Sequence, residues 1–153
     1  MARQVPAVLI AVLLSCMLLS CSPPPSVEQQ IIGVIREMEE QVEAGERRAF
    51  IAHVADDFVG QHGITTRDEL NAMVLLQLNQ HRRLQVQLFP IHVTPTMPGQ
   101  AQASFRVLMT GGPGWIPDSG QMYTVGTRWQ EHDGDWFLVT ARWQAVRVED
   151  VLQ

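Results

Sequence analysis

Residues 121–148 read QMYTVGTRWQEHDGDWFLVTARWQAVRV, and their pattern is the strongest indication of the fold. Apolar and polar residues alternate on both sides of the pair Asp133-Gly134. Both residues of this pair tolerate the positive φ angles of a type I′ turn, which is a strong local signal of a β-hairpin. The pattern therefore predicts two antiparallel strands, at 121–131 and 135–148, joined by a two-residue turn.

The register of this hairpin follows from its turn. With a two-residue turn, Trp129 lies opposite Leu138, and Val125 lies opposite Arg142. Alternation then gives one face the side chains of Tyr123, Val125, Thr127, Trp129, Trp136, Leu138, Thr140 and Arg142. Because this face mixes aromatic groups with a few polar ones, we expect it to line a ligand pocket. The opposite face carries large apolar side chains that we expect to be buried in a homodimer, namely Phe137, Val139 and Trp143.

The rest of the chain predicts helices first and strands afterwards. Two more strands are expected at 84–94 and 100–110. Three helices are expected before them, from Ser26 to a stop at Gly45, from about 46 to 55, and from Thr66 to about Arg83, with a break at 56–60. Ser26 and Thr66 are each followed three residues later by a glutamine or glutamate that completes a capping box. This order predicts an α+β fold, with a curved antiparallel sheet of about four strands packed on three helices.

At this point residues 27–147 resemble the nuclear-transport-factor-2-like superfamily, also called SnoaL-like or ketosteroid-isomerase-like. The resemblance rests on the Ala-Asp-Asp-Phe passage at 55–58, on the third helix, and on the ending Gly-Asp-Trp-Phe-Leu-Val at 134–139. It implies a cone-shaped, cystatin-like domain, a pocket between the helices and the concave face of the sheet, and frequent homodimers. Members include isomerases, dehydratases and transport factors, so the fold alone does not imply a function.

The N-terminal segment is expected to be a targeting sequence. Arg3 is followed by an almost wholly apolar run, which is typical of a signal peptide. Leu18-Leu19-Ser20-Cys21 resembles the bacterial lipobox, which implies cleavage before Cys21 and a diacylglycerol group on its thiol. The alternative is an ordinary signal peptide with two incidental cysteines. We expect a signal peptide at 1–20, a lipidated cysteine and proline-rich tether at 21–26, and the folded domain at 27–149.

This anchor predicts a location and a first partner. The protein is expected to be a membrane-bound lipoprotein of the bacterial cell envelope, attached to the outer membrane and facing the periplasm in a Gram-negative cell. A single acyl chain binds a membrane only reversibly, whereas two or more anchor it stably.

Composition excludes several kinds of chemistry. The 153-residue chain has a net charge of −5, so a nucleic acid is not an expected partner. All 11 basic residues are arginines, which excludes a Schiff-base lysine and a P-loop lysine. Removal of Cys16 and lipidation of Cys21 leave the mature domain without a thiol. No cofactor is expected, and the one cluster of histidine and aspartate, from His53 to His62, is not expected to bind a metal.

We expect a binding or interaction domain rather than an enzyme. The predicted ligand site consists of Phe58, Tyr123, Trp129, Thr140 and Arg142. Its ligand is expected to be a small, mostly apolar molecule with an acidic group, because a buried arginine on a strand needs an anionic or hydrogen-bonding partner. A structural pair between Arg142 and Asp57 or another carboxylate is the alternative to ligand binding.

Two other functions remain open from the sequence. The chain is an isomerase or dehydratase if Asp57 or His62 acts as a general base. However, the carboxylates avoid the strand interiors, where the base of this superfamily commonly lies. The domain is purely structural if side chains fill its pocket and the outer sheet face binds another envelope protein.

Overall fold

The computed structural model describes residues 23–81, 83–112 and 119–146. The predicted signal peptide, Cys21 and residues 147–149 lie outside these ranges, so the domain boundaries remain predictions. Within the described ranges the helices are α2 (Val27–Glu43), α3 (Arg47–Ala52) and α4 (Arg67–Gln80), with a short 3-10 helix η2 (Gln61–Gly63). The strands are β1 (Val54–Gly60), β2 (Thr65–Thr66), β3 (Arg83–Leu88), β4 (His92–Met97), β5 (Gln100–Gly112), β6 (Ser119–His132) and β7 (Asp135–Ala145).

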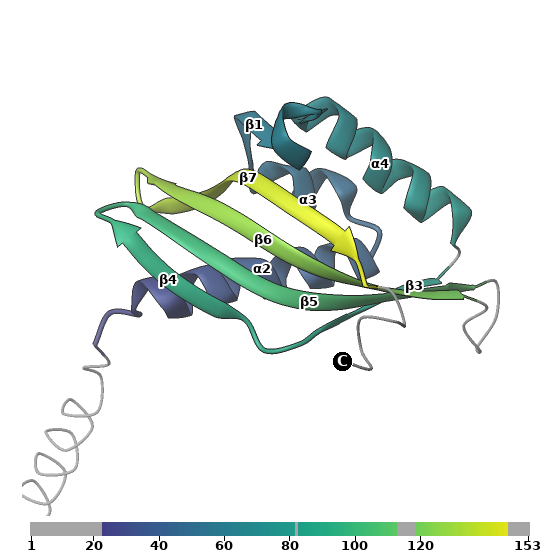
Figure 1. Cartoon of the computed structure of the whole chain (residues 1–153), viewed down its shortest axis with the longest axis horizontal. Coiled ribbons are helices and arrows are strands. Elements are labelled where there is room, and N and C mark those ends of the chain that lie inside the picture. Colours follow the sequence, from purple (N-terminus) through teal and green to yellow (C-terminus); the bar gives the residue numbers. More distant parts are fainter. Residues whose placement is uncertain (1–22, 82, 113–118, 147–153) are drawn as a thin grey trace, which may run out of the picture.

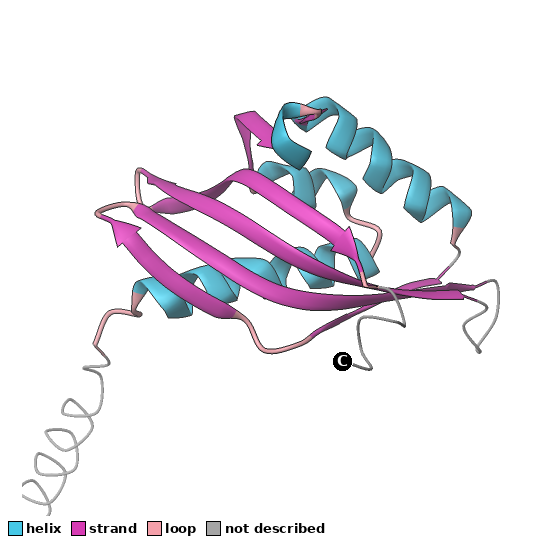
Figure 2. Cartoon of the chain, viewed as in Figure 1, coloured by secondary structure: helices cyan, strands magenta, loops and turns pink. Residues whose placement is uncertain are grey.

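The α+β class is confirmed, but the sheet has seven strands and not about four. Its order is β2-β1-β7-β6-β5-β3, and β4 also pairs with β5 (Figure 1). The predicted strand 84–94 is two strands, because Pro90 interrupts the edge between β3 and β4 and has no N–H to donate. The predicted break at 56–60 is part of β1, which runs parallel to β7. Figure 2 shows the resulting curved sheet with α2 against one face.

The helices begin where the sequence predicts. The Ser26 hydroxyl accepts from the backbone N–H of Gln29, and Thr66 accepts from Glu69 in the same way, which completes both capping boxes. The second and third helices are shorter than expected, ending at Ala52 and Gln80. The buried face of α2 packs in one core with the sheet, through Ile31, Ile35, Met38, Trp129, Trp136 and Leu138. Among the described residues, no helix is both long enough and apolar enough to cross a bilayer.

The final hairpin turns where the sequence predicts, and its register then changes. Asp133 and Gly134 have φ angles of 53° and 91°, as a type I′ turn requires. Trp129 pairs with Leu138 as expected, but the preceding residue, Arg128, pairs with Thr140. One residue of β7 is therefore extra, which is a β-bulge.

This bulge reverses the faces of the second half of β7. Gly126, and not Val125, lies opposite Arg142, while Val125 lies opposite Trp143. Because a one-residue shift moves each side chain to the other face, the predicted inward positions of Thr140 and Arg142 are wrong. Ala141 and Trp143 take those positions instead.

The free edge of β3 is covered by carboxylates of α2. Glu43 accepts a hydrogen bond from the backbone N–H of Val86 at 2.7 Å, and Glu39 accepts one from Leu88 at 3.2 Å. Residues four apart on a helix lie one above the other, and residues two apart on a strand point the same way, so the two spacings match. These bonds satisfy donors that an edge strand otherwise leaves open to pairing with another chain.

Candidate functional site

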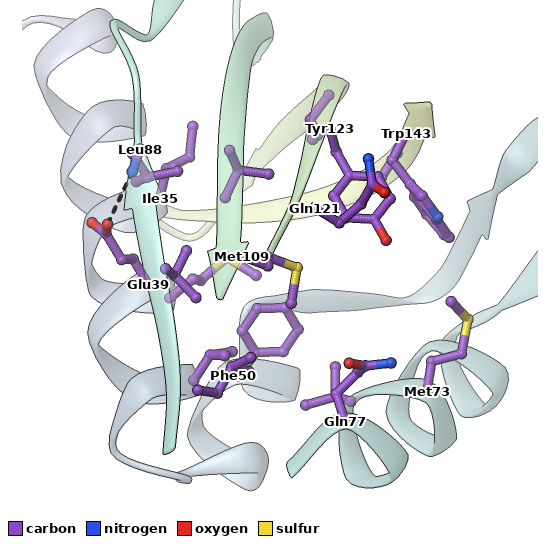
Figure 3. Close-up of a pocket in the computed structure, with 18 of the residues that line it drawn as sticks. Ile35, Glu39, Phe50, Met73, Gln77, Leu88, Met109, Gln121, Tyr123 and Trp143 are labelled. Atoms are coloured by element: carbon purple, nitrogen blue, oxygen red, sulfur yellow. Dashed lines mark hydrogen bonds between the residues drawn. The ribbon is translucent and has the colours of Figure 1, made fainter. Parts of the chain in front are cut away.

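A cavity of about 640 Å³ lies between the helices and the sheet (Figure 3). This volume is in the range of pockets that hold small molecules. Its walls are mainly apolar. They include Ile35, Met38 and Val42 from α2, Phe50 from α3, Leu84, Val86 and Leu88 from β3, Phe105, Val107 and Met109 from β5, Val125 and Trp129 from β6, and Leu138, Ala141 and Trp143 from β7.

Helix α4 forms the remaining wall and is the least covered element of the site. None of its residues is buried. Met73 and Leu76 both line the cavity, yet they are 42% and 53% exposed. Leu75, on the same helix, is 44% exposed but does not belong to the lining. The cavity is therefore open along α4, where apolar side chains meet solvent.

A small number of uncharged polar groups face this space. Gln77 reaches it from α4, and Gln121 and Tyr123 reach it from β6 (Figure 3). The amide nitrogen of Gln121 donates to the backbone oxygen of Met122 at 2.9 Å. Thr127 is already satisfied, because its hydroxyl donates to Ala103 and accepts from the indole of Trp129. The lining thus combines a large apolar surface with a few groups that can orient a ligand.

Charged groups are scarce in the lining. Among its described residues the ionisable side chains are Glu39, His81 and Tyr123, and none is an arginine. Partial burial raises the pKa of the Glu39 carboxyl, while its hydrogen bond from Leu88 acts in the opposite direction.

His81, the residue that follows α4, lies close to β5. It lines the cavity next to Gly111, where a Cβ atom would come within 2.5 Å of the imidazole Nδ1. The glycine therefore permits a close approach between the helix end and the strand.

The predicted ligand residues are only partly brought together. Tyr123 and Trp129 line the cavity as expected. Phe58 is 2% exposed and belongs to the core, not to the cavity lining. Thr140 lines a smaller pocket, of about 360 Å³, with Arg128. Arg142 is exposed and lines neither pocket, so its expected position in the ligand site is wrong.

The proposed acid–base residues also lie away from the cavity. Asp57 and His62 are exposed, and neither is in its lining. The imidazole Nε2 of His62 lies 3.5 Å from a guanidinium nitrogen of Arg142. An isomerase or dehydratase that uses either residue on a molecule in this cavity thus has no geometric basis.

The histidine and aspartate cluster does not gather in space. His53 contacts Gln41 and Glu37 on α2, while Asp56 pairs with Arg67 at 3.7 Å. Across the described part of the chain, no three His, Cys, Asp or Glu side chains come together as potential metal ligands.

The predicted dimer face is also altered. Trp143 lines the cavity and cannot serve on the outer face. Phe137 and Val139 are half-buried, and Val139 borders the smaller pocket. Dimerisation through them remains a prediction.

The pocket was predicted between the helices and the sheet, but no residue of α4 was named among the ligand residues. Its segment Leu70 to Leu78 has apolar residues on every side, including adjacent leucines at 75 and 76. A helix that packs on one side only needs a single apolar stripe. The excess of apolar positions was the available signal that α4 has a second apolar contact.

Solved structures share this architecture. A candidate scytalone dehydratase from Novosphingobium aromaticivorans matches with a TM-score of 0.70 at 14% identity, over 78% of this chain and 84% of that chain. A nuclear-transport-factor-2-like protein of unknown function from Pseudomonas putida matches with a TM-score of 0.66 at 17% identity, over 85% and 95%. An uncharacterised protein with a cystatin-like fold from Caulobacter vibrioides matches with a TM-score of 0.67 at 15% identity, over 80% and 92%.

No protein-family model matches the chain, and no curated protein matches it either. The structural matches establish that the chain has the nuclear-transport-factor-2-like, or cystatin-like, fold, as the sequence resemblance implied.

Proposed function

We propose that this protein is a lipid-anchored binding protein of the bacterial envelope, whose conical domain holds a small and mainly apolar molecule. The observation that carries the proposal is the exposure of cavity-lining side chains on α4. Met73 and Leu76 face the cavity and remain about half exposed. No described part of the chain covers these two side chains, and the proposal is that a bound molecule covers them.

The energetic gain from such binding is appreciable. Complete burial of a leucine or methionine side chain contributes about 1.5–3 kcal/mol. The half-exposed side chains of Met73 and Leu76 therefore offer about 1 kcal/mol each to a ligand that covers them. The inner walls add contacts with Phe50, Met109 and Trp143, which Figure 3 shows around the same space.

Binding is favoured over catalysis because the cavity lacks the expected base. The sequence-based candidates, Asp57 and His62, are outside the lining. The scytalone dehydratase match is at 14% identity and supports the fold alone.

The ligand-binding function is tested with a pair of matched variants. Among the described residues, the buried core cluster and the side chains packed against it lie between Val27 and Trp143, so a domain that starts at Ser22 contains all of them. This domain is titrated with N-phenyl-1-naphthylamine, an uncharged fluorophore that brightens in apolar sites. We expect Leu76→Gln to weaken fluorophore binding about fivefold, and Leu75→Gln to leave it within twofold of the wild type. Equal effects of both variants, or no binding by the wild type, contradict the proposal.

The anchor is tested separately in the cell. A palmitate analogue fed to cells is expected to label the full-length protein and not its Cys21→Ser variant. Fractionation of the envelope then gives the location of the labelled protein. An unlabelled wild-type protein, released by a signal peptidase as a soluble chain, refutes the anchor without affecting the cavity.

A further inference from the structure

We infer that the ligand of the large cavity is uncharged, an apolar molecule that carries a hydroxyl, carbonyl or amide group. The inference rests on the proposed binding function and defines its ligand class. It replaces the acidic ligand that the sequence predicted, since that expectation depended on an inward-facing Arg142.

The charges around the cavity disfavour an anion. No arginine is among the described lining residues, the whole chain contains no lysine, and Arg142 is exposed on the other face of β7. A carboxylate that enters this apolar space gives up its hydration without gaining an arginine or lysine partner. The other basic side chain of the described lining, His81, lies at the end of α4 against Gly111. The Glu39 carboxyl on the α2 wall adds repulsion.

A cation is disfavoured as well. Glu39 is the one carboxylate in the described lining, and it accepts the backbone N–H of Leu88 at the β3 edge. Figure 3 shows this carboxylate directed at Leu88, across the cavity from Gln121 and Tyr123. An ammonium group in the cavity must therefore compete with an existing bond of that carboxylate, and the described lining offers it no second carboxylate.

The polar groups that remain suit a neutral ligand. Gln77, Gln121 and Tyr123 approach the space from a helix on one side and a strand on the other (Figure 3). The amide nitrogen of Gln121 donates to the backbone oxygens of Met122 and Val146, so its side-chain oxygen is the group that it offers to a ligand. Amide and phenol groups both donate and accept, so they match a hydroxyl, a carbonyl or an amide without any change of charge.

The ligand class is tested with three decyl compounds of equal chain length at pH 8. Decan-1-ol, decanoate and decylammonium are each titrated into the domain loaded with the fluorophore, and its displacement is measured. We expect decan-1-ol to bind at least tenfold more tightly than either charged compound. If a charged compound binds as tightly as the alcohol, the inference is wrong while the binding function stands. If none of the three displaces a bound fluorophore, the cavity does not accept the proposed class, and the inference also fails.

A charge introduced into the lining provides the matched control. Met73→Arg places a guanidinium on the cavity side of α4, where its long side chain still reaches solvent. Leu75→Arg adds the same charge at a position of nearly equal exposure, 44% against 42%, outside the lining. We expect Met73→Arg to raise the affinity for decanoate relative to decan-1-ol about tenfold, with no change in Leu75→Arg. An equal shift in both variants points to a general surface effect and overturns the inference.

Discussion

Arg142 of β7 lies opposite Gly126 of β6, one residue away from the partner that a regular hairpin gives it. The cause is the extra residue that separates Leu138 from Thr140 in the pairing with β6. As a consequence, the Arg142 guanidinium lies outside the cavity and the Trp143 indole lines it. The ligand that we propose is therefore a neutral molecule and not an anion.

The first prediction compares the two side chains that the bulge exchanges. Trp143→Ala is expected to weaken fluorophore binding about tenfold, since it removes about 1.4 kcal/mol of apolar contact from the cavity wall. Arg142→Ala is expected to leave binding within twofold, because Arg142 is exposed outside the lining. Fluorescence titration measures both, and thermal unfolding verifies that each variant is folded. If Arg142→Ala weakens binding more than Trp143→Ala does, the result supports the regular hairpin register and contradicts the bulge.

The bulge also marks the limit of prediction from the sequence. The turn at Asp133-Gly134 is a local property of two residues, and its position and conformation were predicted correctly. On its other side β7 pairs with β1, and the register is irregular there too, between Val54 and Val59. That contact joins residues far apart in the sequence, so alternation within the hairpin alone does not reveal it.

The second prediction concerns two glycines in neighbouring strands. Gly111→Ala is expected to destabilise the domain by about 1–3 kcal/mol, because the new Cβ meets the His81 ring at 2.5 Å and displaces the end of α4. Gly126→Ala has nothing within 4 Å of its Cβ and a φ angle outside the left-handed region. We expect it to be neutral or to stabilise by about 0.5 kcal/mol, since alanine restricts the unfolded chain. Urea denaturation of the two variants gives both values, and equal losses argue against the His81 contact.

The third prediction is a pH dependence of opposite sign at two glutamates. Burial raises the pKa of Glu39, so its ionisation costs stability as the pH rises through and above about 4.3. Hydrogen bonds from the backbone and hydroxyl of Thr66 lower the pKa of Glu69, so its contribution is present above that pH and is lost on acidification. As the pH rises from 3.5 to 7, the stability of Glu39→Gln relative to the wild type should therefore increase. The stability of Glu69→Gln relative to the wild type should decrease over the same range.

Urea denaturation across this pH range checks the signs. Each variant is compared with the wild type at the same pH, which cancels the titration of all other groups. Parallel curves for Glu39→Gln and the wild type indicate that the Glu39 carboxyl is solvated as in the unfolded chain.

The helices illustrate what local sequence does determine. Capping boxes at Ser26 and Thr66 depend on residues three apart, and both form as predicted. Strand β1 was missed because aspartate is uncommon in strands and β1 contains Asp56 and Asp57. Its pairing with β7 joins residues far apart in the sequence, which the local pattern does not reveal. The cavity was missed in part because it depends on the placement of α4 relative to β5 and β6.

The fourth prediction tests how Gln61 fixes the inward strand. Its side-chain amide donates to the backbone oxygen of Trp143 at 2.9 Å and accepts from the backbone N–H of Trp143 at 3.2 Å, while its own φ angle is 47°. The two bonds stabilise a backbone conformation that costs a residue with a Cβ atom about 1 kcal/mol. Gln61→Gly removes both the bonds and the strain, whereas Gln61→Ala removes the bonds and keeps the strain.

We expect the glycine variant to be less stable than the wild type by about 1–2 kcal/mol, and the alanine variant to lose about 1 kcal/mol more. Urea denaturation measures this order, and a glycine variant as stable as the wild type shows that the bonds to Trp143 contribute no more than the strain costs.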